Sequence, residues 1–137
     1  MVMHNIRNGY YLAAGMLALL FAFTHAWNGH ATVLTSLHIG ELTIDTRTIF
    51  TYVWHIITVE NLVFGIAFIL MSLYRDPSKV RFVAWLIVIL LIARLLVILG
   101  VTVWFDAAAF TDTLVDSAAI IIYAILILLG ARNKTAQ

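Results

Sequence analysis

Six ionisable residues fall inside stretches of sequence that are otherwise apolar enough to cross a membrane. Imidazole and carboxylate groups together suit zinc, iron, copper or manganese, and two histidines alone can hold a haem iron from its two sides. The same residue types also mark proton and ion pathways in membrane proteins. The chemistry available depends on how the surrounding elements position these side chains. The six residues are His25, His55, Glu60, Arg94, Asp112 and Asp116.

The composition is that of an integral membrane protein. Of the 137 residues, 64% are hydrophobic and only 11% are charged, whereas soluble domains average about 25% charged residues. The formal net charge is +1, so no basic surface for nucleic acid is indicated. The chain has no cysteine, which excludes disulfides, thiolate metal ligands and thiol catalysis. We therefore expect the lipid bilayer to be its main partner.

Four apolar segments reach the length of about 20 residues that a bilayer-spanning helix needs. Backbone groups in lipid must be hydrogen-bonded internally, so we expect α-helices. The predicted fold is an all-α integral membrane protein, a single domain over 1–137 forming an antiparallel four-helix transmembrane bundle. The loop at 28–47 holds two pieces, TVLTSL and ELTID, that could pair as a short β-hairpin. The expected helices span about 10–27, 48–74, 80–105 and 107–130.

Basic residues near the helix ends predict the orientation. If the four helices alternate in direction, six Lys and Arg residues lie on one side and Arg47 alone lies on the other. The cytoplasmic side of a membrane protein carries the excess of basic residues. We therefore expect a multi-pass protein of the plasma (bacterial inner) membrane, with both termini in the cytoplasm and loop 28–47 outside. The six are Arg7, Arg75, Lys79, Arg81, Arg132 and Lys134.

The six ionisable residues within the spans share one band of depth. Counted from the inner basic residues at about 1.5 Å per residue, they lie from about 20 Å (Arg94) to about 30 Å (His55 and Asp112) from the inner surface. A charge at the centre of a transmembrane helix costs about 2.5–3.5 kcal/mol on the insertion scale. These side chains are therefore expected to face the bundle interior or a wet cavity rather than lipid.

Glu60 and Arg94 are predicted to form a structural ion pair. Each lies 17 residues from Pro77, so a hairpin at this proline places the two at one level. With Arg94 assigned to Glu60, Asp112 and Asp116 have no basic partner within the membrane other than histidines. Two carboxylates one turn apart repel each other, and protonation, a histidinium ion or a bound cation would relieve this repulsion.

The remaining residues form the candidate metal or cofactor site. Histidine nitrogens and aspartate oxygens would be the ligands of a transition metal, or the two membrane histidines would hold a haem. The alternative is structural, because a single membrane histidine commonly hydrogen-bonds a carbonyl or a threonine. The candidates are His25, His55, Asp112 and Asp116, with His30 and His38 of the predicted outer loop beside them.

Two short segments carry a resemblance to a known family. HAWNGHATVL (25–34) and TYVWHIIT (51–58) contain a His-x-x-x-Gly at the end of the first helix and a Trp-His near the start of the second. The matching residues are His25, Gly29, Trp54 and His55. This pattern resembles a family of small, uncharacterised bacterial membrane proteins with four predicted spans. The resemblance covers the first half of the chain and implies the four-span architecture, with two histidines of interest.

Three functions are compatible with these residues. The first is an outward-facing intramembrane His/Asp pocket that binds a cation, a metal or a haem-type cofactor. The second is an accessory or scaffolding subunit of an oligomer or larger membrane complex, whose buried charges are structural or meet a partner. The third is a small proton- or ion-coupled transporter, although apart from Gly65 and Tyr123 the inner half of the bundle is nearly pure hydrocarbon. No nucleophile with an activating base is evident, so the sequence does not decide whether the protein is an enzyme.

Overall fold

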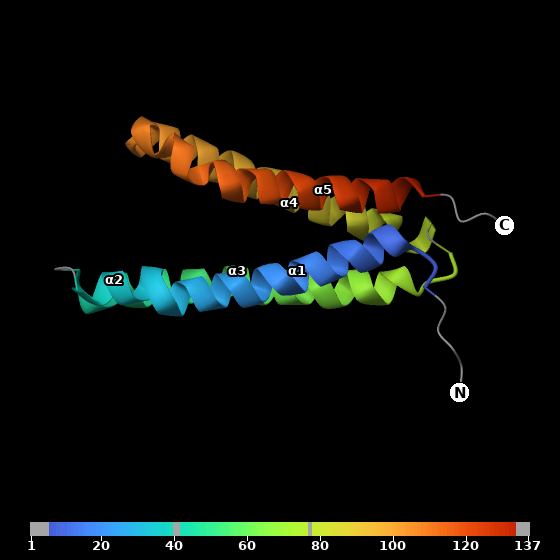
Figure 1. Ribbon diagram of the computed structural model, residues 1–137, viewed down its shortest axis with the longest axis horizontal. Helices are drawn as coiled ribbons and strands as arrows, with labels where there is room; N and C mark the ends of the chain where they lie inside the picture. Colours follow the sequence, from blue (N-terminus) through green and yellow to red (C-terminus); the bar gives the residue numbers. More distant parts are fainter. Residues whose placement is uncertain (1–5, 40–41, 77, 134–137) are drawn as a thin grey trace.

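Four long helical segments make up the fold. The computed structural model describes residues 6–39, 42–76 and 78–133, and these ranges contain helices and connecting turns but no strand. Each segment is long and apolar enough to cross a membrane, and consecutive segments run antiparallel (Figure 1). The prediction of an all-α, four-helix transmembrane bundle is therefore confirmed, and the protein is a multi-pass membrane protein. The four spans are Gly9–Ser36, Ile44–Ser72, Ser78–Phe105 and Ala107–Arg132.

Two of the four spans contain a local departure from α-helical geometry. The first consists of α1 (Gly9–Asn28), a π-helical turn η1 (Gly29–Val33) and α2 (Leu34–Ile39). The second and third are the single helices α3 (Ile44–Ser72) and α4 (Ser78–Phe105). The fourth begins with a 3₁₀ segment, η2 (Ala107–Thr113), and continues as α5 (Leu114–Arg132). The carboxylate of Asp106 accepts a hydrogen bond from the backbone N–H of Ala108 at 3.1 Å, so it caps the fourth span.

The prediction of a loop at 28–47 is wrong for most of the residues in this range that the structure describes. The first span stays helical to Ile39 and α3 already begins at Ile44. The TVLTSL piece of the predicted β-hairpin is helical, and Leu34 within it is only 7% exposed. The burial of the Leu34 side chain stabilises the helix by more than the weak helix propensity of nearby Gly29 destabilises it. Thr43 ends the shortened connection, because its side chain accepts a hydrogen bond from the backbone N–H of Thr46 and so caps α3.

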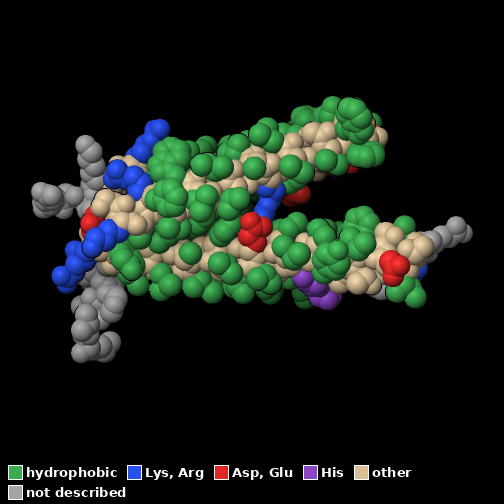
Figure 2. Space-filling view, turned by 180° about the vertical axis from the view of Figure 1, so that it is seen from behind, with side chains coloured by type: hydrophobic (Ala, Val, Ile, Leu, Met, Phe, Trp, Pro, Cys, Tyr) green, Lys and Arg blue, Asp and Glu red, His purple; other side chains and the backbone are tan. Residues whose placement is uncertain are grey.

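The helices form two pairs that separate toward one end of the molecule. α1 packs along α3, α4 packs along α5, and α1 also contacts α5. Although α3 and α4 are joined by a short turn, each packs mainly against other helices. The pairs meet at the end that holds the start of α1, the end of α5 and the end of α3 (Figure 1), where basic side chains gather (Figure 2). We call this the basic end. At the opposite end, the open end, a gap separates the two pairs (Figure 2).

The buried core lies in the half of the bundle nearer the basic end. Phe68 of α3 is at its centre, with the ring of Tyr11 at 5.5 Å and the ring of Tyr123 at 6.1 Å between centroids. A ladder of small residues on α1 faces this core. Its alanines let α1 approach its neighbours closely in lipid. The buried members of the ladder are Ala14, Ala18 and Ala22.

Asn8 ties three helix ends together at the basic end. Its side chain is buried, accepts a hydrogen bond from the backbone N–H of Tyr11 and donates one to the carbonyl of Gly130 at 2.8 Å. The backbone N–H groups of Arg7 and Asn8 both donate to the carbonyl of Ser72. The start of α1 is thus joined to the ends of α3 and α5, and this end of the bundle stays closed.

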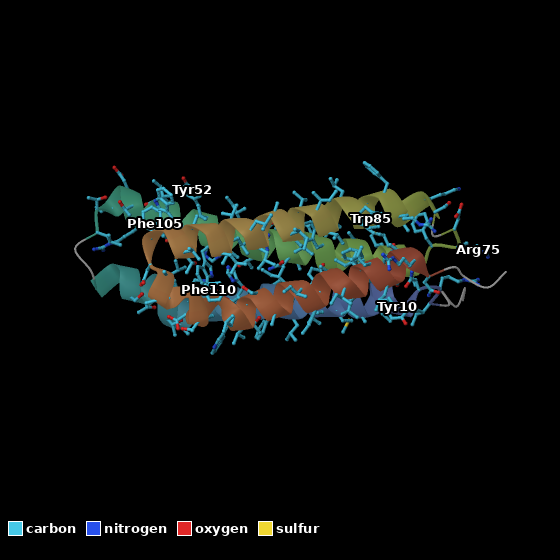
Figure 3. The ribbon with its side chains drawn as sticks, turned by 90° about the horizontal axis from the view of Figure 1, so that it is seen from above. Tyr10, Tyr52, Arg75, Trp85, Phe105 and Phe110 are labelled. Carbon is cyan, nitrogen blue, oxygen red and sulfur yellow. The ribbon has the colours of Figure 1, made fainter. Side chains whose placement is uncertain are left out.

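Aromatic side chains lie toward both ends of the bundle (Figure 3). Tyr10 and Trp85 lie toward the basic end, and Phe105 and Phe110 lie toward the open end. Trp104 and Phe105 are 84% and 82% exposed. Tryptophan and tyrosine are enriched where a membrane protein meets the two membrane–water interfaces. Their placement agrees with helices that cross the bilayer from one interface to the other.

Two glycines bring the backbones of α1 and α3 into contact. A Cβ atom added at Gly15 would lie 2.9 Å from the carbonyl oxygen of Gly65 and 2.9 Å from the backbone nitrogen of Ile69. Both neighbours are backbone atoms, so only a movement of the helices could make room. Gly100, on α4, has nothing within 4 Å of an added Cβ.

We predict that Gly15→Ala lowers the free energy of unfolding by about 1–3 kcal/mol, because the added methyl group forces α1 and α3 apart. Thermal unfolding of the detergent-purified protein measures the loss. Gly100→Ala is the matched control and should be neutral or slightly stabilising, because alanine has the higher helix propensity. Equal losses in the two variants would contradict the close contact.

Candidate functional site

An ion pair joins the two helix pairs near the middle of the membrane span. Arg94 of α4 donates a hydrogen bond to the carboxylate of Glu60 of α3, as expected from their equal distances to Pro77. The side chains of Arg94 and Glu60 are 19% and 32% exposed. On the basic side of this pair lie buried core residues such as Phe64 and Leu91. The ion pair therefore stands where the core ends and the gap begins.

The face of α5 that looks toward the ion pair changes from buried to exposed along its length. Asp116 and Tyr123 are two turns apart, so they lie on the same face. Tyr123 is only 1% exposed, and its ring packs on Phe21 of α1 and Phe68 of α3. Asp116 is exposed. Because the two helix pairs have separated at the level of Asp116, its carboxylate borders the gap.

Three buried polar atoms near the ion pair have no hydrogen-bond partner in the described part of the chain. They are the hydroxyl of Tyr123, the hydroxyl of Ser117 and Nε2 of His25. Electrostatic interactions connect Arg94 with Tyr123 and with His25, and connect His25 with Asp116. Buried polar groups in proteins are nearly always hydrogen-bonded. Each of the three is therefore a polar group that the described chain leaves without a hydrogen bond.

The His-x-x-x-Gly and Trp-His residues form a packing contact between α1 and α3. The indole of Trp54 stacks on the ring of His25, with centroids 4.2 Å apart and planes 7° apart. The indole N–H donates to the carbonyl of His25 at 2.9 Å. A Cβ atom at Gly29 would lie 2.2 Å from the indole nitrogen, so a larger residue there would collide with Trp54. Three of the four pattern residues thus hold two helices together.

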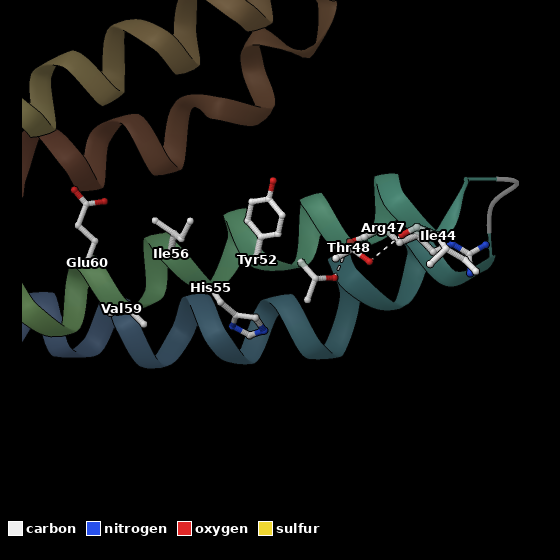
Figure 4. A pocket seen from close by; sticks show the side chains of 9 residues that line it. Ile44, Arg47, Thr48, Tyr52, His55, Ile56, Val59 and Glu60 are labelled. Atoms are coloured by element: carbon white, nitrogen blue, oxygen red, sulfur yellow. Dashed lines mark hydrogen bonds between the residues drawn. The ribbon is translucent and has the colours of Figure 1, made fainter.

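The fourth pattern residue, His55, points away from the gap. Figure 4 shows Tyr52, Ile56 and Glu60 pointing toward the α4/α5 pair, while His55 points to the other side of α3. Five residues separate His55 from Glu60, which turns their directions about 140° apart on an α-helix. The ring of His55 lies 5.4 Å from that of His30, centroid to centroid.

The structure does not bring His25, His55, Asp112 and Asp116 together in one metal site. Among the residues described, no group of three or more His, Cys, Asp or Glu side chains could hold a metal ion. A haem would need two histidines opposed across the bundle, but His25 and His55 lie on adjacent helices and contact different rings. Asp112, in η2, is exposed. His38 lies in α2, and its side chain is outside the described part of the structure.

A groove leads along α3 from the open end to the ion pair (Figure 4). Its volume is about 830 Å³, and it runs from Ile44 to Glu60. Tyr52, Ile56 and Val59 give it a largely apolar surface. A lipid-soluble molecule could follow this surface to the carboxylate of Glu60.

Ser117 is a site residue that the sequence did not single out. The sequence does contain a signal for it, since Ser117 is a lone hydroxyl in an apolar run directly after Asp116. Counted back from Arg132 at about 1.5 Å per residue, Ser117 is level with the ion pair, about 22 Å from the basic end.

We predict that Arg94→Met lowers the free energy of unfolding by about 3 kcal/mol, because the carboxylate of Glu60 loses its partner inside the membrane. The double variant Glu60→Met/Arg94→Met should recover most of this loss, since an apolar pair of similar volume replaces both charges. Unfolding in detergent measures both effects. Asp45→Asn, at an exposed acid in the first turn of α3, should change little. A double variant as unstable as the sum of the two single variants would refute the pairing.

The chain was also compared with known proteins. It matches no protein-family model, no curated protein and no solved structure. We therefore infer its function from the chemistry of its own residues.

Proposed function

We propose that this protein binds a lipid-soluble amine, a cationic head group on an apolar tail, in the gap between its helix pairs. The observation that carries the proposal is the set of three unpartnered buried polar atoms beside the Asp116 carboxylate and the Glu60–Arg94 pair. They come from α1 and α5, while the ion pair comes from α3 and α4. All four helices thus carry polar groups near the level at which the gap closes.

The charge around the gap favours a cation. Glu60 and Arg94 neutralise each other, which leaves the carboxylates of Asp112 and Asp116. In the described ranges no second Lys or Arg lies at the level of Asp116. Arg47 lines the groove nearer the open end, in the first turn of α3, and the other basic residues lie toward the basic end. A site lined by one sign of charge with apolar walls concentrates the opposite charge.

The hydrogen-bonding capacity of the site matches an ammonium group. An ammonium has three N–H donors and no acceptor. The hydroxyls of Ser117 and Tyr123, an imidazole nitrogen of His25 and the carboxylate of Asp116 can all accept hydrogen bonds. An amine head would therefore satisfy atoms that the chain leaves unpaired. Hydrogen bonds to a charged group are worth about 1.5–3 kcal/mol each.

The walls of the gap suit an apolar tail. Exposed apolar side chains lie on the Glu60 face of α3 and on the Arg94 face of α4, including Ile56 on the first and Val97 and Val101 on the second. Each CH₂ group removed from water contributes about 0.8 kcal/mol. Tail contacts would thus add affinity that does not depend on the polar site.

The ligand is proposed to enter from outside or from the outer leaflet. Six basic residues on one side against Arg47 on the other favour a cytoplasmic basic end and an external open end. Toward the basic end the path is filled by Tyr11, Phe68 and Ile127, each 0% exposed. This packing favours a binding pocket closed on the cytoplasmic side over a pathway through the bundle.

Binding of dodecylamine, dodecanol and dodecanoate to the protein in nanodiscs tests the proposal, with native mass spectrometry as the readout. We predict that dodecylammonium binds at least about tenfold more tightly than the other two, because it alone supplies charged donors. Asp116→Asn should weaken its binding about tenfold, and Tyr123→Phe should weaken it while keeping the ring in the core. Asp45→Asn serves as the control for removal of an exposed acid.

Two outcomes would overturn the proposal. One is equal binding of all three amphiphiles, or amine binding that Asp116→Asn leaves unchanged. The other is a photocrosslink from position 56 to a second protein rather than to lipid-like molecules. In that case the gap receives a partner helix, and the accessory-subunit alternative replaces the binding function.

A further inference from the structure

A pair of histidines takes no part in the proposed amine site, although one of them, His55, also lines the groove along α3. His30 belongs to the π-helical turn η1 and is exposed, whereas His55 of α3 is half-buried. Their ring centroids are 5.4 Å apart and their planes are tilted by 44°. In Figure 2, histidine side chains lie together on the surface of the α1/α3 pair, on the side away from the gap. We propose that His30 and His55 together bind a divalent late transition metal.

The distance between the rings fits two ligands of one ion. If two imidazole nitrogens bind one Zn²⁺ at about 2.1 Å with a tetrahedral angle, their ring centroids lie about 5.3 Å apart. The observed 5.4 Å agrees with this arrangement. No hydrogen bond or ion pair to a described residue occupies either ring, so the nitrogens are available. Because His30 is exposed, water can complete the coordination.

The two histidines are held in place by the contact between Gly29 and Trp54, the residues that directly precede them in the sequence. His30 directly follows Gly29, and His55 directly follows Trp54. The Trp54 indole lies against Gly29 and is fixed by its hydrogen bond to His25. The positions of both metal-binding candidates are therefore set before any metal binds. His30 belongs to a π-helical turn. Such turns are rare in proteins, and those that occur are often found at functional sites.

Neutral imidazole nitrogens suit Cu²⁺, Ni²⁺ and Zn²⁺, and the Irving–Williams order predicts the tightest binding for Cu²⁺. The site lies about 30 Å from the basic end, at the membrane interface beside the open end. With only two protein ligands, an ion bound there keeps positions that water or another molecule can occupy. Such a site would take up metal from the side of the membrane that the open end faces.

Isothermal titration of the full-length detergent-purified protein with Zn²⁺ and Cu²⁺ tests the proposal. We predict one ion per chain, tighter binding of Cu²⁺ than of Zn²⁺, and a loss of at least about tenfold in His30→Ala and in His55→Ala alike. His38→Ala, which removes a histidine of α2 outside the pair, should bind as the unchanged protein does. The unfolding temperature without metal shows whether each variant is still folded.

A second readout separates ligation from a structural role of the rings. Zn²⁺ should raise the unfolding temperature of the unchanged protein, because an ion held by α1/η1 and α3 stabilises only the folded state. It should not raise that of the double variant His30→Ala/His55→Ala. The electron paramagnetic resonance spectrum of bound Cu²⁺ should show nitrogen ligands. Absence of binding, or binding that survives in the double variant, would overturn the proposal, while the amine site could still stand.

Discussion

The ion pair between Glu60 and Arg94 is the constraint from which the shape of the bundle follows. Two charges near the middle of a membrane span are too costly to face lipid, so α3 and α4 must present them to each other. On the basic side, aromatic and aliphatic side chains fill the space between the helix pairs. On the other side the pairs separate (Figure 2). The two charges thus hold together helices that otherwise have little direct contact, at the one level where packing gives way to a gap.

The α1/α3 pair can follow its own course beyond the ion pair because it is joined along its whole length. The Gly15–Gly65 contact holds its basic half, and Trp54 against Gly29 holds its open half. Glycines allow the two backbones to approach, which in lipid is the main source of helix association. The bundle is therefore better described as two helix pairs, closed at the basic end by Asn8, than as four equivalent helices.

The sequence predicted the features that depend on composition and counting. Hydropathy located the four spans, and the equal distances of Glu60 and Arg94 from Pro77 predicted their contact. The sequence-based predictions were wrong where tertiary contacts determine the local structure. The segment after Asn28 contains Gly29 and several threonines, which suggested a loop, but contact with α3 keeps it helical. Equal depth also misled for the site, because residues at one level face different directions. His55 of the predicted site points away from the gap that Asp116 borders, and depth alone carries no information on direction.

The polar residues within the membrane span fall into groups with different structural or binding roles. Trp54 and Gly29 are needed for packing, and their contact also fixes the residues that follow them, His30 and His55. The histidine pair consequently lies on the outside of one helix pair, while the carboxylate of Asp116 and the unpartnered hydroxyls lie between the two pairs. The two imidazoles of the histidine pair are thereby kept apart from the acceptors that border the gap. A metal held by the first set would not compete for the acceptors that the second set offers to an amine.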